Sequence, residues 1–292
     1  MFKFLSSTDA RFAPRARRAK ACFALFAVAA LAGPVAADGE WSDQGRCNVP
    51  DSFIAQHVPL PRTALKLRTD QPIKIVAIGS SSTEGVGASD PDNAYPARLE
   101  EELERRWPEA DVTVINRGVG GERSFQMLAR FDKDVFAEHP DLVIWQAGTN
   151  GALTSDETAN ATREIIKTGV QRLKGAGIDV VLMSPQYAPS FNRAQRNLLH
   201  VEAIRSAGRQ KSVAVFRRFE IMQYWLASGQ MTLDEMLSPD GLHLNDLSYG
   251  CVANQMAALI DHATRDKSLL VANAAQGSSL PASVFAGEGS GQ

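Results

Sequence analysis

The sequence predicts an α/β protein in which a five-stranded parallel sheet lies between two layers of helices, a three-layer α/β/α sandwich. Five short apolar segments rich in β-branched residues alternate with longer segments of helical periodicity. The links between these segments are short, and such alternation favours parallel strands joined by right-handed crossovers. With 44% hydrophobic and 22% charged residues over 292 positions, the chain has the composition of a protein with an ample core.

The individual elements are expected where apolar runs end at glycine, proline or small polar residues. We expect strands at residues 73–79, 111–116, 141–146, 178–183 and 212–216. We expect helices at residues 94–107, 123–138, 156–174, 192–210, 219–228 and 246–262. Together they predict one domain over residues 71–265, preceded by an extended lead-in at 38–70 and followed by a disordered tail at 266–292.

The first 37 residues have the pattern of a secretory signal peptide. They hold six basic residues and one acidic residue, a charge of +5, which leaves −7 for residues 38–292 because the whole chain carries −2. The apolar run Ala21–Gly33 is shorter than the ~20 residues of a spanning helix, and small residues precede a cut after Ala37. We therefore expect an exported protein, periplasmic or secreted, with no stable membrane insertion after cleavage. A retained anchor is the alternative.

The acidic charge of the remaining chain argues against nucleic acid as a partner.

Three cysteines are present, and Cys22 lies in the expected signal peptide. Cys47 and Cys251 remain, and two cysteines of an exported chain can form a disulfide in an oxidising compartment. Two unpaired buried thiols are the alternative.

Small polar sequences follow the first three expected strands. These are Ser81 after the first strand, residues 118–121 after the second, and residues 148–150 after the third. Because the carboxyl ends of parallel strands share one edge of the sheet, we expect these segments to lie together. Ser81 is the candidate nucleophile, since Gly79 allows a sharp bend and nearby N–H groups favour developing negative charge. An ordinary serine-rich turn is the alternative.

A serine nucleophile needs a base, and the base needs a group that orients it. Of the five histidines, only His243 has a carboxylate three residues before it, that of Asp240. A turn there can bring the carboxylate to one imidazole nitrogen and leave the other nitrogen for Ser81. A plain turn at residues 238–241 is the alternative.

A developing oxyanion needs donors that are already in place. The candidates are the N–H groups of Ser81 and Gly121 and the side-chain amide of Asn150. The alternatives are a tight turn for the glycines and a cap for Asn150.

At this point the sequence resembles a known family. Residues 79–83 (Gly-Ser-Ser-Ser-Thr), Gly121 within 116–122, residues 148–150 (Gly-Thr-Asn) and residues 240–243 (Asp-Gly-Leu-His) look like the four blocks of the SGNH hydrolases, the GDSL esterase/lipase superfamily. The resemblance implies a flavodoxin-like three-layer fold and a triad of Ser81, His243 and Asp240. It also implies Gly121 and Asn150 as oxyanion donors, and no metal or organic cofactor. Two positions depart from the pattern: Ser80 stands where the family usually has Asp, and Gly151 stands where Asp is common.

The interpretation is therefore an exported serine esterase acting on a small-molecule or polysaccharide ester. Low aromatic content, 7%, and no evident lid domain favour small acyl groups, such as acetyl on carbohydrate. The alternatives are a lipid or aryl esterase or lysophospholipase, an O-acyltransferase with the same triad, and a non-catalytic binding module on this fold. The sequence leaves the oligomeric state open. It lacks the glycine pattern of a dinucleotide site and clustered metal ligands.

Overall fold

The computed structural model describes residues 45–154, 156–192 and 196–265, so the expected signal peptide and tail lie outside the described residues. Its sheet has five parallel strands in the order β2-β1-β3-β4-β5. Their bounds are β1 (Ile73–Gly79), β2 (Val112–Gly118), β3 (Leu142–Gln146), β4 (Asp179–Met183) and β5 (Ala214–Phe216). The expected strand pattern is confirmed, and β1 lies next to the centre of the sheet.

Helices precede and follow the strands along the chain. They are α1 (Pro61–Arg68), α2 (Ser81–Glu84), α3 (Tyr95–Arg106), α4 (Ser124–Ala129), α5 (Phe131–Asp134), α6 (Thr149–Thr154), α7 (Ala159–Gly175), α8 (Pro189–Asn192), α9 (Asn197–Lys211), α10 (Arg218–Ala227), α11 (Leu233–Met236) and α12 (Asp246–Arg265). Short 3₁₀ helices cover Asp51–Phe53, Pro91–Asn93 and Phe136–Glu138. The helix expected at 123–138 is thus divided into α4, α5 and a 3₁₀ turn.

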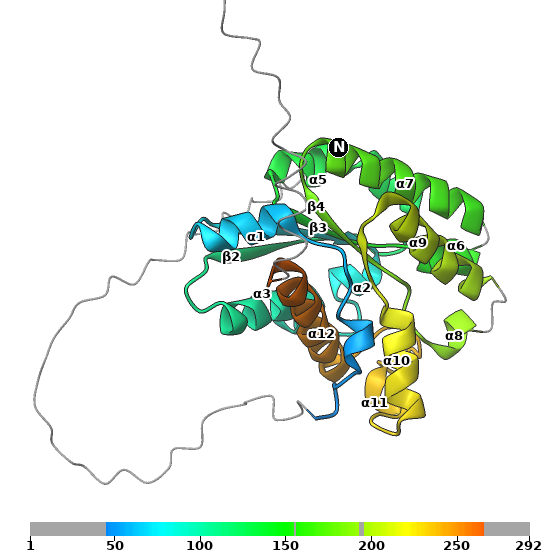
Figure 1. The fold of residues 1–292 in the computed structure, drawn as a ribbon. Coiled ribbons are helices and arrows are strands. Elements are labelled where there is room, and N and C mark those ends of the chain that lie inside the picture. Colours follow the sequence, from blue (N-terminus) through cyan, green and yellow to red (C-terminus); the bar gives the residue numbers. More distant parts are fainter. Residues whose placement is uncertain (1–44, 155, 193–195, 266–292) are drawn as a thin grey trace, which may run out of the picture. The chain divides into compact units, whose positions relative to one another are not determined.

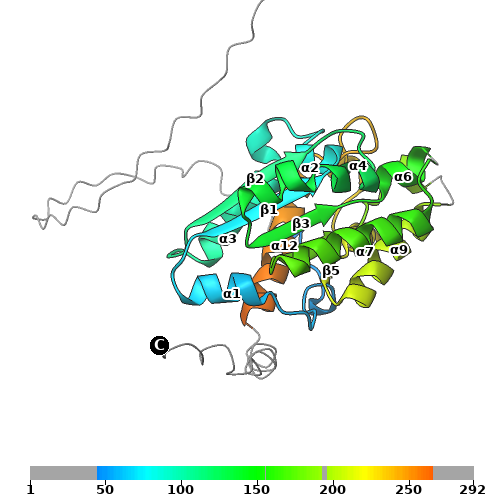
Figure 2. The same ribbon diagram turned by 90° about the horizontal axis from the view of Figure 1, so that it is seen from above.

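The alternation of side chains along β1 divides the core into two layers. Ile75 and Ala77 join buried residues of α3, α10 and α12 on one face of the sheet. Val76 and Ile78 join buried residues of α4, α7 and α9 on the other face. Figure 1 shows these two helical layers on opposite sides of the sheet, and Figure 2 shows the sheet beneath α7 and α9. The expected three-layer α/β/α fold is therefore confirmed.

The expectation of an extended lead-in at 38–70 is wrong for its second half, which forms α1. Pro61 occupies the first helical turn, where a missing N–H costs nothing. Thr63 is fully buried, and its N–H and hydroxyl both donate to Asp179 Oδ2 at 2.8 Å. The carboxylate at the start of β4 therefore anchors this helix, and a contact across 116 residues leaves no local signal.

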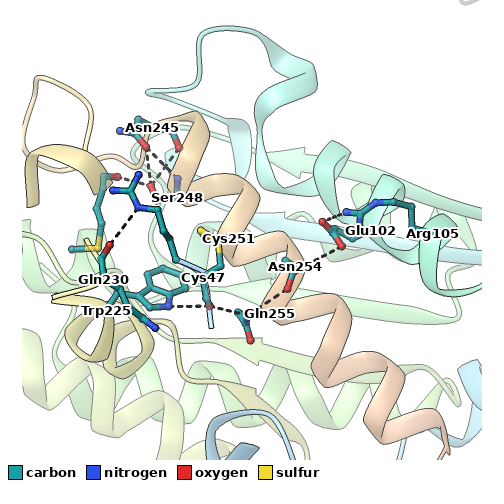
Figure 3. The surroundings of a disulfide bond; sticks show 12 residues. Cys47, Glu102, Arg105, Trp225, Gln230, Asn245, Ser248, Cys251, Asn254 and Gln255 are labelled. Atoms are coloured by element: carbon teal, nitrogen blue, oxygen red, sulfur yellow. Dashed lines mark hydrogen bonds and ion pairs between the residues drawn. A yellow bond between two sulfur atoms is a disulfide. The ribbon is translucent and has the colours of Figure 1, made fainter. Parts of the chain in front are cut away.

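Earlier in the lead-in, a disulfide joins Cys47 to Cys251 of α12, with Cα atoms 5.1 Å apart. The carbonyl of Cys47 also accepts hydrogen bonds from Trp225 Nε1 at 3.1 Å and Gln255 Nε2 at 2.8 Å (Figure 3). Both cysteines are buried. The chain at Cys47 is therefore attached to α10 and α12, two helices on one face of the sheet.

Candidate active site

The turn from β1 into α2 depends on a glycine. A Cβ atom at Gly79 would lie 2.1 Å from Thr83 Oγ1 and 2.8 Å from Gln146 Oε1, so a larger residue does not fit. The N–H and hydroxyl of Ser80 donate to the same Gln146 oxygen at 2.9 and 3.1 Å. This tight turn makes Ser81 the first residue of α2, at the carboxyl end of a central strand.

Ser81, His243 and Asp240 form a continuous chain of hydrogen bonds. Ser81 Oγ lies 2.8 Å from His243 Nε2, and His243 Nδ1 lies 2.5 Å from Asp240 Oδ2. The sequence analysis expected these three residues to lie together. In the structure they do, although Ser81 and His243 are 162 positions apart in the chain. The distances are those expected for a nucleophile, a base and an orienting acid.

The other carboxylate oxygen of Asp240 is fully used inside its own loop. Oδ1 accepts from the hydroxyl of Ser238 at 2.8 Å and from the N–H groups of Leu242 and His243 at 2.9 Å each. Partial burial of the Asp240 carboxyl favours its neutral form, but the bonds from His243, Leu242 and Ser238 outweigh burial and hold the pKa well below its ordinary value. Asp240 is therefore a carboxylate at neutral pH and can accept the Nδ1 proton.

The hairpin that carries Asp240 and His243 is closed by backbone bonds. Ser238 N–H donates to His243 O at 2.8 Å, and Leu237 pairs with Leu244. Gly87 packs against it: a Cβ there would lie 2.3 Å from Leu244 O, and the residue has φ +94°. The sequence pattern did not reveal this role for Gly87, because the contact joins segments more than 150 residues apart.

Two of the proposed oxyanion donors, Gly121 and Asn150, belong to or contact the turn that follows β2. A Cβ added to Gly120 would be 4.0 Å from Ser81 Cβ, so this turn comes close to Ser81. Gly121 has φ +77° and open space where a Cβ would stand, and within the described ranges its N–H makes no hydrogen bond. Asn150 Nδ2 donates to Glu122 O at 2.9 Å, which places its amide at this turn and leaves one amide proton.

The two departures from the family pattern have structural reasons. Ser80 hydrogen-bonds Gln146 and is almost completely buried, so the short hydroxyl suits this space. A Cβ at Gly151 would lie 3.0 Å from His200 Cε1 and 3.3 Å from Glu157 Cβ, so an Asp does not fit there without movement of its neighbours. Both residues are therefore small because their surroundings leave little room.

The fold and the comparison with family models define the chain as a member of the SGNH superfamily. Within that class, the model of the non-GDSL lipase-like family matches residues 46–266, which is most of the sequence. The chain belongs to this family.

The similar proteins share only about a quarter of their residues with this chain over the matched regions. An arylesterase from Vibrio mimicus is 24% identical over 151 residues, or 48% of this chain and 71% of the relative. An N-acylneuraminate cytidylyltransferase from Escherichia coli is 26% identical over 153 residues, or 51% of this chain and 36% of the relative. A two-domain esterase active on acetylated mannans has a similar structure, with a TM-score of 0.61 at 23% identity. The match covers 74% of this chain and 57% of the two-domain esterase.

Two further features concern metals and membranes. Across residues 45–154, 156–192 and 196–265, His, Cys, Asp and Glu side chains form no group of three or more that could hold a metal ion. In the same part of the chain, every helix is too short or too polar to cross a bilayer.

Proposed function

We propose that the chain is a serine esterase that uses Ser81 as nucleophile, His243 as general base and Asp240 as the orienting acid. The observation that carries the proposal is the unbroken hydrogen-bond chain from Ser81 Oγ through His243 to Asp240 Oδ2. A binding module on the same fold has no need for a carboxylate, an imidazole and a hydroxyl in this order.

In the proposed reaction, Ser81 Oγ attacks the ester carbonyl carbon while His243 Nε2 takes the hydroxyl proton. The carbonyl oxygen becomes an oxyanion and accepts hydrogen bonds from the N–H groups of Ser81 and Gly121 and the amide of Asn150. The imidazolium then gives its proton to the departing alcohol, which leaves an acyl group on Ser81. Water, deprotonated by the same imidazole, attacks the acyl carbon, and the acid is released with restoration of the serine.

For the substrate, we propose small acyl groups, acetyl in particular, on carbohydrate. The similar two-domain esterase is active on acetylated mannans, which supports a carbohydrate ester for this chain as well. The arylesterase relative supports the alternative of an aryl ester. A sugar hydroxyl in place of water would make the same site an O-acyltransferase.

We also propose that the protein works outside the cytoplasm. The disulfide between Cys47 and Cys251 is of a kind that persists in oxidising compartments, which supports the export expected from residues 1–37. Mass spectrometry of the protein from the cell envelope or medium should show a chain that begins near Asp38. A precursor found intact in the cytosol would contradict export.

The test of activity is hydrolysis of p-nitrophenyl esters of increasing acyl length, beside acetate release from acetylated mannan and xylan. We expect the highest kcat/KM for the acetyl ester, acetate release from at least one glycan, and neither activity in Ser81→Ala. A preference for long acyl chains would favour a lipid esterase. Inactivity on every ester, with no labelling by a fluorophosphonate, would favour the binding module.

A further inference from the structure

Gln186, which follows β4, contacts the sequence neighbours of three proposed active-site residues. Its Oε1 accepts from Thr149 Oγ1 at 3.1 Å and, more weakly, from Ser82 Oγ at 3.5 Å. Its Nε2 donates to Leu242 O at 3.3 Å. Thr149 precedes Asn150, Ser82 follows Ser81, and Leu242 precedes His243. One buried amide therefore connects the three segments that supply the proposed nucleophile, base and oxyanion donor: the starts of α2 and α6 and the hairpin of His243.

Arg218, the first residue of α10, lies behind this amide and is fully buried. Its Nη2 donates to Gln186 Oε1 at 2.9 Å, and its Nε donates to Ser184 O at 3.1 Å. Over residues 45–154, 156–192 and 196–265, no carboxylate forms an ion pair with Arg218, and Nη1 has no hydrogen-bond partner. Burial lowers the pKa of Arg218 to about 10, opposed by the phenols of Tyr249 and Tyr95, so the side chain remains a cation at neutral pH.

This cation determines which way the Gln186 amide faces. A guanidinium carries only donors, so it can meet the oxygen of the amide but not its NH₂ group. With Oε1 fixed toward Arg218, Nε2 points to the carbonyl of Leu242. A buried cation that has no carboxylate partner lowers the free energy of unfolding. Proteins tolerate such a loss of stability mainly at functional sites.

We propose that Gln186 is a positioning residue that sets the loops of Ser81, Asn150 and His243 relative to one another, and that Arg218 orients it. The inference rests on the proposed function, because it assigns a role within that active site. Gln186 touches no reacting atom and acts through Ser82, Thr149 and Leu242. Its loss should lower kcat and leave KM little changed, since loop displacement of about 1 Å can cost on the order of 10²-fold in rate.

The test variant is Gln186→Glu, which keeps the shape and the acceptor for Arg218 but replaces the donor to Leu242 O with an oxygen. We expect kcat on an activated ester and the rate of fluorophosphonate labelling to fall by about 10²-fold. Thermal stability should be maintained, because the new carboxylate pairs with Arg218. Where this variant does not fold, Thr149→Val removes one hydrogen bond to Gln186 at constant shape, and a smaller fall in kcat is expected.

The matched control is Gln255→Glu. Gln255 is likewise buried, and its Nε2 likewise donates to a backbone carbonyl, that of Cys47. In the described part of the chain no cation hydrogen-bonds to Gln255, so this variant should lose stability and keep kcat. We therefore expect Gln186→Glu to lower kcat at unchanged thermal stability, and Gln255→Glu to lower thermal stability at unchanged kcat.

A readout without substrate keeps this inference separate from the proposed function. The proton between His243 Nδ1 and Asp240 Oδ2, 2.5 Å apart, gives a resonance far downfield in the proton NMR spectrum. We expect this resonance to shift or broaden in Gln186→Glu and to be unchanged in Gln255→Glu. If both variants match the wild type in this resonance and in kcat, the positioning role is overturned. If the wild type cleaves no ester, the proposed function fails, and the resonance alone decides whether Gln186 positions the loop.

Discussion

The hydrogen bonds that orient Asp240 in its hairpin are mostly local, whereas the turn after β2 that carries Gly121 bonds to distant segments. In the hairpin, Asp240 Oδ1 accepts three bonds from residues within three positions of it. At the turn, Val119 N–H donates to Gly79 O, and Glu122 O accepts from Asn150. The acid–base half of the site therefore depends mainly on local bonds, while the oxyanion half depends on the assembly of three strands.

The largest expected effect comes from the residue that both halves share. Ser81→Ala should lower ester hydrolysis by on the order of 10⁶-fold, because it removes the nucleophile, and His243→Ala should be nearly as severe. Measurement of kcat is paired with a fluorophosphonate adduct mapped by mass spectrometry. The adduct should be on Ser81, and it should stay there in Ser80→Ala and Ser82→Ala. An adduct on Ser80 or Ser82, or activity that survives Ser81→Ala, would refute the assignment.

The next change tests the local half alone. Asp240→Asn should lower kcat by roughly 10⁴-fold, because an amide cannot hold the imidazole in the required tautomer. Since the hairpin also closes through Ser238 N–H and His243 O, the backbone should remain in place. Circular dichroism and kcat measured together check this. Unfolding of the variant would show that the hairpin depends on the carboxylate for its structure.

The third change tests the half formed by distant segments. Asn150→Ala removes one proposed oxyanion donor and its bond to Glu122 O, and should lower kcat by roughly 10²–10³-fold. Steady-state kinetics with an acetyl ester measure the effect, which should fall on kcat more than on KM. An unchanged kcat would leave the backbone N–H groups of Ser81 and Gly121 as the donors.

Removal of the disulfide tests whether the hairpin depends on α12, the helix that follows it. Cys251 lies on α12, eight positions after His243, and its bridge to Cys47 should contribute ~2–5 kcal/mol to the free energy of unfolding. Denaturant titration of Cys47→Ala with Cys251→Ala measures the loss. Titration of two free thiols in the unfolded, unreduced wild type would contradict the bridge.

The smallest effect on activity is expected at the amino ends of the strands, where Asp179 of β4 anchors α1. Burial raises the pKa of Asp179 to about 6, against the hydrogen bonds from Thr63. Between pH ~4 and ~6 the folded chain therefore binds more protons at this group than the unfolded chain, so stability falls as pH rises, by about 3 kcal/mol at most. In Asp179→Asn this slope should be absent and kcat unchanged. A slope equal to that of the wild type would exclude Asp179 as its source.

The contrast between the two halves also explains what the sequence could predict. Asp240 and His243 are three positions apart, and the alternation of apolar and helical segments is a local pattern, so both could be predicted. The bonds of Gln146 to Ser80, of Gln186 to Thr149 and Leu242, and of Thr63 to Asp179 join residues 37 to 116 positions apart. No periodicity or spacing marks such contacts, because they form only when the strands are assembled.

The disulfide between Cys47 and Cys251 has a topological consequence. The two residues are 204 positions apart, and Ser81, Asp240 and His243 all lie between them. The covalent bond closes the chain into a ring that contains every strand of the sheet. A protease that cuts any one exposed loop of this ring yields a nicked molecule, not two fragments, and only reduction or a second cut can separate the nucleophile from its base.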